Sequence, residues 1–339
     1  RLKAKKHARL TEVEADKDEP EGKLRERFAE HVAEEAETLL TQTSSKRIPA
    51  PVIAVVVNRV ATARRVFELL RKSVESTGDG ASILLTGRVR PFDRDRIFEE
   101  WLPHLSAGRE ERSAENGPLY VVATQTVEVG ANFDFDGLIT EMAPIDALRQ
   151  RFGRVDRLGR RGKTESVIVA RKDHIKRGYD DPIYGRTLPK SWKWLKEHQE
   201  GKGKNKYLDM SADRFPVPDD AEEMKELSSP GKAAPTMMPS HIDSWAQTSP
   251  ASEPSPDVSV FLHGAESGPA DVNIVWRGDL PEQLTRDDAE TYVSTVSTVT
   301  PSSMEALPVP IWEVRAWLKG TAIGEIGDVE GEAEPSPER

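Results

Sequence analysis

The chain has 339 residues, of which 48 are Lys or Arg and 58 are Asp or Glu, giving a formal net charge of −10. It contains no Cys, which excludes a disulfide framework, a thiolate zinc site and a cysteine nucleophile, and which suits a reducing, cytoplasmic location. No apolar run approaches the ~20 residues that a membrane-spanning helix needs, so we expect no membrane partner. Because the first residue is Arg, we expect a piece of a longer protein.

The charge is distributed unevenly along the chain. Residues 215–339 hold 7 basic and 23 acidic side chains, a net of −16, so the preceding residues carry a net of +6. Phosphate binding depends on the local electrostatic field. The basic part therefore remains compatible with nucleic-acid binding, although the whole chain is acidic.

The first residues, 1–48, are polar and charged and have one thin apolar stripe at helical spacing, which predicts a partly helical connector. From residue 49 to 172, short apolar runs alternate with amphipathic helical patterns. This alternation predicts an α/β fold with a parallel sheet and helices on both faces, in which ligands lie at the carboxyl ends of the strands. The expected strands are 53–57, 83–85, 119–123, 138–139 and 167–170, and the expected helices are 62–74, 92–105 and 145–155.

The later residues divide into four segments by composition. Residues 173–215 predict a helical accessory segment, with Trp192 and Trp194 on a helix that docks on the sheet domain. Residues 216–256 are rich in Pro and Ser, which indicates a linker. Residues 257–320 regain apolar runs and predict a small accessory domain, whereas residues 321–339 predict a disordered acidic tail.

The densest chemical signal is the run of residues 150–162, QRFGRVDRLGRRG. On a helix, Gln150, Arg154 and Arg157 would share one face, and the two guanidinium groups would suit phosphate oxygens. The alternative is a solvated basic helix face. Gly153 favours phosphate binding, because Gly inside a helix costs about 1 kcal/mol relative to Ala and close approach of a ligand or a neighbouring element is a reason to keep it.

Three further polar stretches follow predicted strands. Thr124 and Gln125 come directly after the strand 119–123, where donors to a phosphodiester backbone are expected. Asn58 and Thr62 lie at the start of the next helix after the strand 53–57. Capping of that helix explains these residues as well as an anion-binding site does. Arg88 opens a group of arginines after the strand 83–85.

In this order and spacing, VVVNRVATAR, VVATQTVEVG and QRFGRVDRLGRRG resemble motifs IV, V and VI of the second RecA-like lobe of superfamily 2 helicases. The stretches TQTVEVGANFDFDGLITEMAPIDALRQRFGRVDR and DPIYGRTLPKSWKWL are most similar to the CRISPR-associated helicase–nuclease family of type I systems. The resemblance covers residues 50–200 well and residues 240–320 more loosely. It implies a RecA-like helicase C-terminal lobe.

The resemblance also implies a function and roles for single residues. The function is that of the C-terminal lobe of an ATP-dependent single-stranded DNA translocase or helicase in CRISPR antiviral interference. Arg154 and Arg157 would face the γ-phosphate of ATP on the partner lobe, with Gln150 beside them, while Glu128 and Gly130 would lie at the nucleotide side of the cleft. The residues expected to contact the DNA strand are Asn58, Thr62, Arg88, Thr124 and Gln125.

The phosphate loop G-x-x-x-x-G-K-[ST] is missing from this sequence. Gly162-Lys163-Thr164 comes near it, but Arg157 stands where the first Gly belongs. We therefore expect ATP and Mg²⁺ to be bound mainly by a first helicase lobe, with no metal site in this chain and no ATPase activity of the chain alone. The expected partners are single-stranded DNA, that first lobe and a CRISPR RNA-guided surveillance complex. The alternative function is a non-hydrolysing nucleic-acid-binding or regulatory RecA-like module.

Overall fold

A computed structural model describes residues 4–16, 19–128, 132–231, 235–247, 261, 271–277, 285–298 and 301–321. The chain forms two compact units, of which the first ends at Pro230 and the second begins at Gly231. Over the described residues, no helix combines the length and the apolarity needed to cross a membrane.

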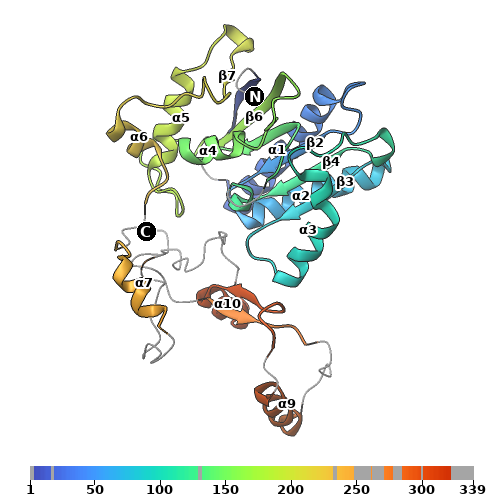
Figure 1. Cartoon of the computed structure of the whole chain (residues 1–339), viewed down its shortest axis with the longest axis vertical. Helices are drawn as coiled ribbons and strands as arrows, with labels where there is room; N and C mark the ends of the chain where they lie inside the picture. The colour runs from blue at the N-terminus through green and yellow to red at the C-terminus, as the bar shows by residue number, and fades with distance from the viewer. Residues whose placement is uncertain are drawn as a thin grey trace. The chain divides into compact units, whose positions relative to one another are not determined.

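The first unit is built around a seven-stranded sheet with the order β3-β4-β2-β5-β6-β1-β7 (Figure 1). All neighbouring strands pair in parallel except β7, which is antiparallel to β1. The predicted α/β fold with a mostly parallel sheet is therefore confirmed. The strands are β1 Lys5–Val13, β2 Val52–Val56, β3 Ala81–Leu85, β4 Leu119–Ala123, β5 Gly137–Glu141, β6 Lys163–Arg171 and β7 Leu208–Asp209.

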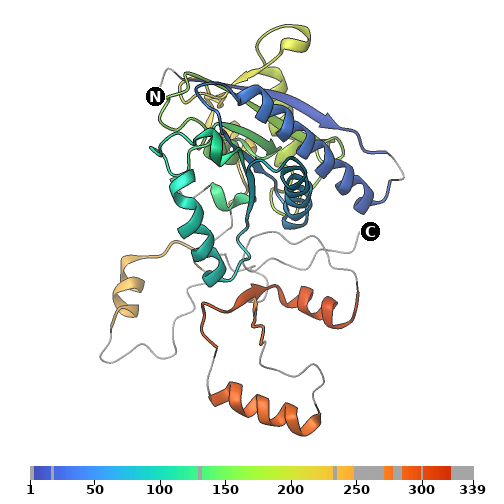
Figure 2. The same ribbon diagram turned by 90° about the vertical axis from the view of Figure 1, so that its right-hand side faces the viewer.

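Helices cover both faces of this sheet. Successive strand residues point to opposite sides, so strands that are apolar throughout present an apolar surface for packing on each face. On one face, α1 and α2 bury side chains such as Ile53 and Val55, and Figure 2 shows α1 running along that side of the unit. On the other face, apolar residues of α4 and α5 belong to the same buried core as Val52 and Ala54. The helices of this unit are α1 Glu21–Thr43, α2 Val60–Thr77, α3 Pro91–Leu105, α4 Ile145–Phe152, α5 Thr187–Glu197 and α6 Ala221–Leu227.

The prediction that residues 1–48 form a connector is wrong. Strand β1 pairs along its whole length with β6, and one face of α1 is buried against the sheet. The sequence of β1, KKHARLTEV, hides this role because polar or charged residues occupy most of its positions. Its place in the sheet comes from a partner strand more than 150 residues away, which a local pattern does not reveal.

The predicted boundaries after residue 172 also need correction. Strand β7 belongs to the same sheet, and α6 packs on α5, where the Ser191 hydroxyl donates to the Leu227 carbonyl at 3.1 Å. The predicted linker 216–256 therefore contains ordered helix in its first part, and it also contains α7 Pro239–Trp245. Few apolar residues mark α6. Its N-cap is Asp220, whose carboxylate accepts the backbone N–H of Glu223.

The expected helix with Trp192 and Trp194 is confirmed as α5. Trp192 is buried on the sheet, and its indole N–H donates to the Glu12 carboxylate of β1 at 3.1 Å. The accessory segment is thus joined to strand β1 of the sheet.

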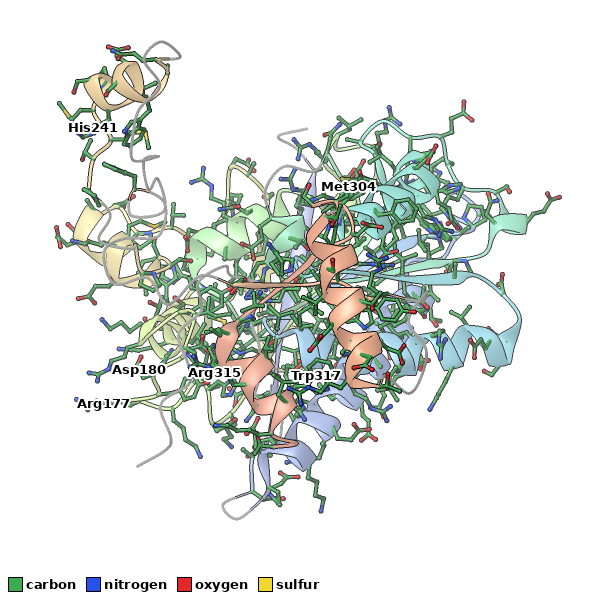
Figure 3. All side chains as sticks on the ribbon, turned by 90° about the horizontal axis from the view of Figure 1, so that it is seen from below. Arg177, Asp180, His241, Met304, Arg315 and Trp317 are labelled. Carbon is green, nitrogen blue, oxygen red and sulfur yellow. The ribbon has the colours of Figure 1, made fainter. Side chains whose placement is uncertain are left out.

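The second unit contains small elements in addition to α7. Strands β8 Val272–Ile274 and β9 Leu307–Val309 form an antiparallel pair, and the helices are α9 Arg286–Thr298 and α10 Ile311–Leu318. Figure 3 labels Arg315 and Trp317 on α10, where the Trp317 side chain is exposed. The apolar run at 258–262, apart from residue 261, and the acidic tail from residue 322 lie outside the described residues.

Candidate functional site

Helix α4 ends at Phe152, and Gly153 is its C-cap. The prediction that Gln150, Arg154 and Arg157 share a helix face is therefore wrong, because both arginines lie in the turn that follows the helix. Gly153 does not lie inside the helix either. A Cβ at this position would lie 3.0 Å from the Gln150 carbonyl oxygen, so a larger residue would crowd the last helical turn.

The end of α4 is fixed by a cation from β1. The Lys6 ammonium group donates to the Phe152 carbonyl at 2.8 Å, and this contact is buried. Carbonyl groups at a helix C-terminus carry partial negative charge and favour a cation there. The position of the following turn, with its two arginines, therefore depends on the strand that the sequence did not predict.

Arg154 and Arg157 differ in how they are held. The Arg154 guanidinium donates to the carbonyls of Val127 at 3.2 Å and Glu128 at 2.7 Å. The Arg157 backbone N–H donates to Asp134 at 2.7 Å, while its guanidinium has no hydrogen bond or ion pair to any residue the structure describes. Burial and the nearby charge of Arg157 lower the pKa of Arg154. Two neighbouring cations without a carboxylate partner favour an anion.

The other predicted nucleotide-side residues are placed as follows. Gln150 is exposed on α4. The Glu128 carboxylate lies 2.8 Å from the Arg151 guanidinium, so it is engaged with α4 itself. Gly130 lies outside the described residues.

Arg151 is the residue that the sequence analysis missed. Its side chain is 0% exposed, and it links the ends of three strands to α4 and to the accessory segment. Burial alone would lower the pKa of Arg151, but the Glu128 charge and further partners raise it. Its acceptors, besides Glu128, are Thr140 Oγ1 at 2.8 Å, the Glu141 carbonyl at 3.0 Å, Asn58 Oδ1 at 2.9 Å and the Tyr184 hydroxyl at 3.2 Å.

A sequence signal for this arginine was present. Arg151 follows Ala147 by four residues and Leu148 by three, and both belong to the apolar, buried face of α4. An arginine in an otherwise apolar helix stripe is a candidate for a buried ion pair.

The predicted nucleic-acid residues gather where β2 and β4 end, as the parallel topology requires. Asn58 is buried, donates to the Met142 carbonyl at 2.8 Å and accepts from Arg151. The Gln125 amide donates to the Asn58 carbonyl at 3.1 Å and to the Tyr184 hydroxyl at 3.2 Å. Thr124 is 0% exposed.

Thr62 is buried in the first turn of α2, and Arg88 is partly exposed after β3. The capping interpretation of Asn58 and Thr62 is wrong, since the N-cap of α2 is Arg59 and it makes no side-chain cap.

A second buried group of charges lies beside Asn58. The backbone N–H of Asn58 donates to the Glu141 carboxylate at 2.7 Å, and burial raises the pKa of Glu141 to about 7. The Arg59 guanidinium pairs with Asp181 at 3.0 Å, and both side chains are buried. The strand ends are thus tied to the accessory segment by charge as well as by hydrogen bonds.

In the part of the chain that the structure describes, no group of three His, Cys, Asp or Glu residues could hold a metal ion.

Comparison with known proteins identifies the family that this lobe resembles. Residues 50–160 match the family model described as CRISPR-associated nuclease/helicase Cas3, C-terminal. A putative CRISPR-associated nuclease/helicase Cas3 of Methanocaldococcus jannaschii is 30% identical over 107 residues, which are 32% of this chain and 13% of that protein. A CRISPR-associated helicase Cas3 of Thermoproteus tenax is 34% identical over 115 residues, 34% of this chain and 17% of that protein.

A solved structure, the crystal structure of T. fusca Cas3-AMPPNP, has a TM-score of 0.53 at 17% identity and covers 93% of this chain and 37% of that one. At this identity the likeness shows the fold alone. The aligned region spans less than a fifth of either curated relative named above. The motif pattern agrees with these comparisons, and residues 50–160 are similar to the C-terminal part of CRISPR-associated Cas3 helicases.

Proposed function

We propose that this chain supplies the second lobe of an ATP-dependent single-stranded DNA helicase or translocase that acts in CRISPR antiviral interference. The observation that carries the proposal is the pair Arg154 and Arg157, two neighbouring guanidinium groups with no carboxylate ion pair within the described residues. The Cas3-type lobe and the names of the relatives support the CRISPR context. A CRISPR RNA-guided surveillance complex is the recruiting partner we propose.

The proposed nucleotide site lies between this lobe and a first lobe that holds most of the ATP and its Mg²⁺. Bound ATP and Mg²⁺ would supply the transferable phosphoryl group and part of its charge neutralisation. Arg154 and Arg157 would stabilise the negative charge that grows on the phosphoryl oxygens. The two carbonyls that hold Arg154 fix its orientation and leave its Nη1 group without a partner among the described residues.

The proposed DNA track crosses the carboxyl ends of β2, β3 and β4. Arg88 is partly exposed, and its cation suits a phosphate. Asn58, Thr62 and Thr124 are buried, and Gln125 donates inside the lobe. We propose that these four shape the strand ends on which the DNA backbone lies.

The test of the arginine pair uses the full-length protein with its first lobe. Arg154→Ala or Arg157→Ala should lower the ATPase turnover by about 10³–10⁵-fold, the value of an arginine finger, and should leave single-stranded DNA binding nearly unchanged. Arg149→Ala is the matched control, because Arg149 is exposed on the same segment. A variant that keeps more than about a tenth of the turnover, a loss below ~1.4 kcal/mol, contradicts the finger role of that residue.

One observation favours the alternative, a non-hydrolysing binding module. Arg154 is already engaged by two carbonyls of its own lobe, which a purely structural arginine would also be. In that case Arg154→Ala would destabilise the lobe and weaken DNA binding, while ATPase activity of the full-length protein would be absent in the unaltered form too.

A further inference from the structure

We propose that Tyr184 is a positioning residue whose hydroxyl fastens Gln125 to Arg151, and that the accessory segment thereby sets the position of the strand end of β4 relative to α4. We call Tyr184, Gln125 and Arg151 the tyrosine latch. The proposal rests on the proposed function, because it assigns the latch a part in the response to DNA.

The hydroxyl oxygen of Tyr184 is a shared acceptor. It receives the Gln125 amide at 3.2 Å and the Arg151 guanidinium at 3.2 Å. Tyr184 is 4% exposed, so water does not readily replace either contact. Burial also raises the pKa of Tyr184 to about 12, and the hydroxyl therefore stays neutral at physiological pH.

The backbone around Tyr184 is held rigidly. Asp181 accepts the backbone N–H groups of Ile183 at 2.8 Å and Tyr184 at 2.9 Å, and it pairs with Arg59 at the end of β2. Asp181 and Gly185 exchange two backbone hydrogen bonds of 2.8 and 2.7 Å. A side chain carried on such a closed turn can fix its partners within a narrow range of geometry. Figure 3 labels Arg177 and Asp180 on the loop that leads into this turn.

The two partners of the hydroxyl depend on it unequally. Arg151 keeps its contacts with Glu128, Thr140, Glu141 and Asn58 when the hydroxyl is removed. The Gln125 amide keeps only the Asn58 carbonyl, and its Oε1 atom is buried without a partner among the described residues. Loss of the hydroxyl should therefore loosen Gln125 far more than Arg151.

Gln125 begins a short 3₁₀ turn that ends at Val127, and the carbonyls of Val127 and Glu128 hold Arg154. The latch thus lies between the proposed DNA track and the proposed finger arginine. When Gln125 samples other positions, a smaller fraction of the protein has the arrangement that binds DNA. The apparent affinity for DNA falls in proportion to that fraction. The expected result is weaker apparent DNA affinity with nearly normal turnover at saturating DNA.

The experiment compares Tyr184→Phe with Tyr207→Phe in the full-length protein. The Tyr207 hydroxyl lies in the same segment and donates to Glu200 at 3.0 Å, so its removal is the same chemical change outside the latch. The single-stranded DNA concentration that half-saturates ATPase activity should rise about three- to tenfold in Tyr184→Phe, the effect of losing the one neutral hydrogen bond to Gln125. Maximal turnover should stay within about twofold, and Tyr207→Phe should match the unaltered protein.

Hydrogen exchange provides a readout that does not depend on activity. The backbone N–H groups of Thr124 and Glu128 donate to Leu85 and Gln125, and both should exchange faster in Tyr184→Phe than in Tyr207→Phe. Equal exchange and equal DNA half-saturation in the two variants would overturn the proposal. A fall in turnover together with general destabilisation would also overturn it, because it indicates a purely structural tyrosine. If the unaltered protein shows no DNA-stimulated ATPase, the proposed function fails, and the exchange comparison still decides the latch.

Discussion

Replacing Arg151 by Ala should lower the free energy of unfolding of the first unit by about 3–5 kcal/mol. Removing one partner of a buried ion pair leaves the other charge uncompensated, and this alone accounts for most of that loss. Here the charge left behind is the Glu128 carboxylate, whose side chain is 12% exposed. Four neutral acceptors also lose a donor worth about 0.5–1.5 kcal/mol each, and water entering the space left by the arginine would restore part of this.

Native-state hydrogen exchange is a suitable assay, because β2 and β5 are buried central strands and we expect their amides to exchange through global opening of the unit. Arg149→Ala, an exposed change on the same helix, should alter the free energy by no more than about 0.5 kcal/mol. Adding Glu128→Gln to Arg151→Ala should recover part of the loss by removing the unpaired charge. A loss below about 1 kcal/mol in Arg151→Ala would refute the reasoning, since the buried network would then contribute little.

Three further outcomes are expected. Because burial raises the pKa of Glu141 to about 7 from its ordinary value of 4.5, the folded state retains a proton that the unfolded state releases. The free energy of unfolding should therefore fall by up to about 3 kcal/mol as pH rises through this window, and urea titrations of Glu141→Gln should show a flatter profile. The binding of single-stranded DNA should weaken with a log–log salt slope of about −0.7 per phosphate neutralised, and Arg88→Ala should reduce that slope by about one phosphate. The purified 339-residue chain should show no DNA-stimulated ATPase, because it lacks a phosphate loop; a clear signal in a coupled assay would contradict this.

The sequence predicted those parts of the fold whose burial is visible in local composition. Strand β2 is buried at all five positions, and a continuous β-branched run is the direct consequence of burial on both faces. Strand β1 could not be found in this way, because its place depends on pairing with β6. Its charged side chains lie partly at the edge of the core and find partners on other elements, as Arg9 does with Glu35 of α1.

The spacing of the motifs located the candidate site but did not show which of its side chains face a ligand. Parallel strands end at the same edge of a sheet, so we expected the polar residues after β2 and β4 to lie close together, and in the structure they do. Whether such a side chain faces a ligand or the protein depends on partners far along the chain: Asn58 meets Arg151 across 93 residues. Arg151, Arg154 and Arg157 differ in whether a carboxylate neutralises the guanidinium charge. The Arg151 guanidinium donates to the Glu128 carboxylate and to neutral acceptors, whereas the guanidinium groups of Arg154 and Arg157 have no carboxylate partner within the described residues. The partners of each guanidinium group cannot be read from the sequence. They distinguish Arg151, which stabilises the lobe, from Arg154 and Arg157, which are available to bind a phosphate.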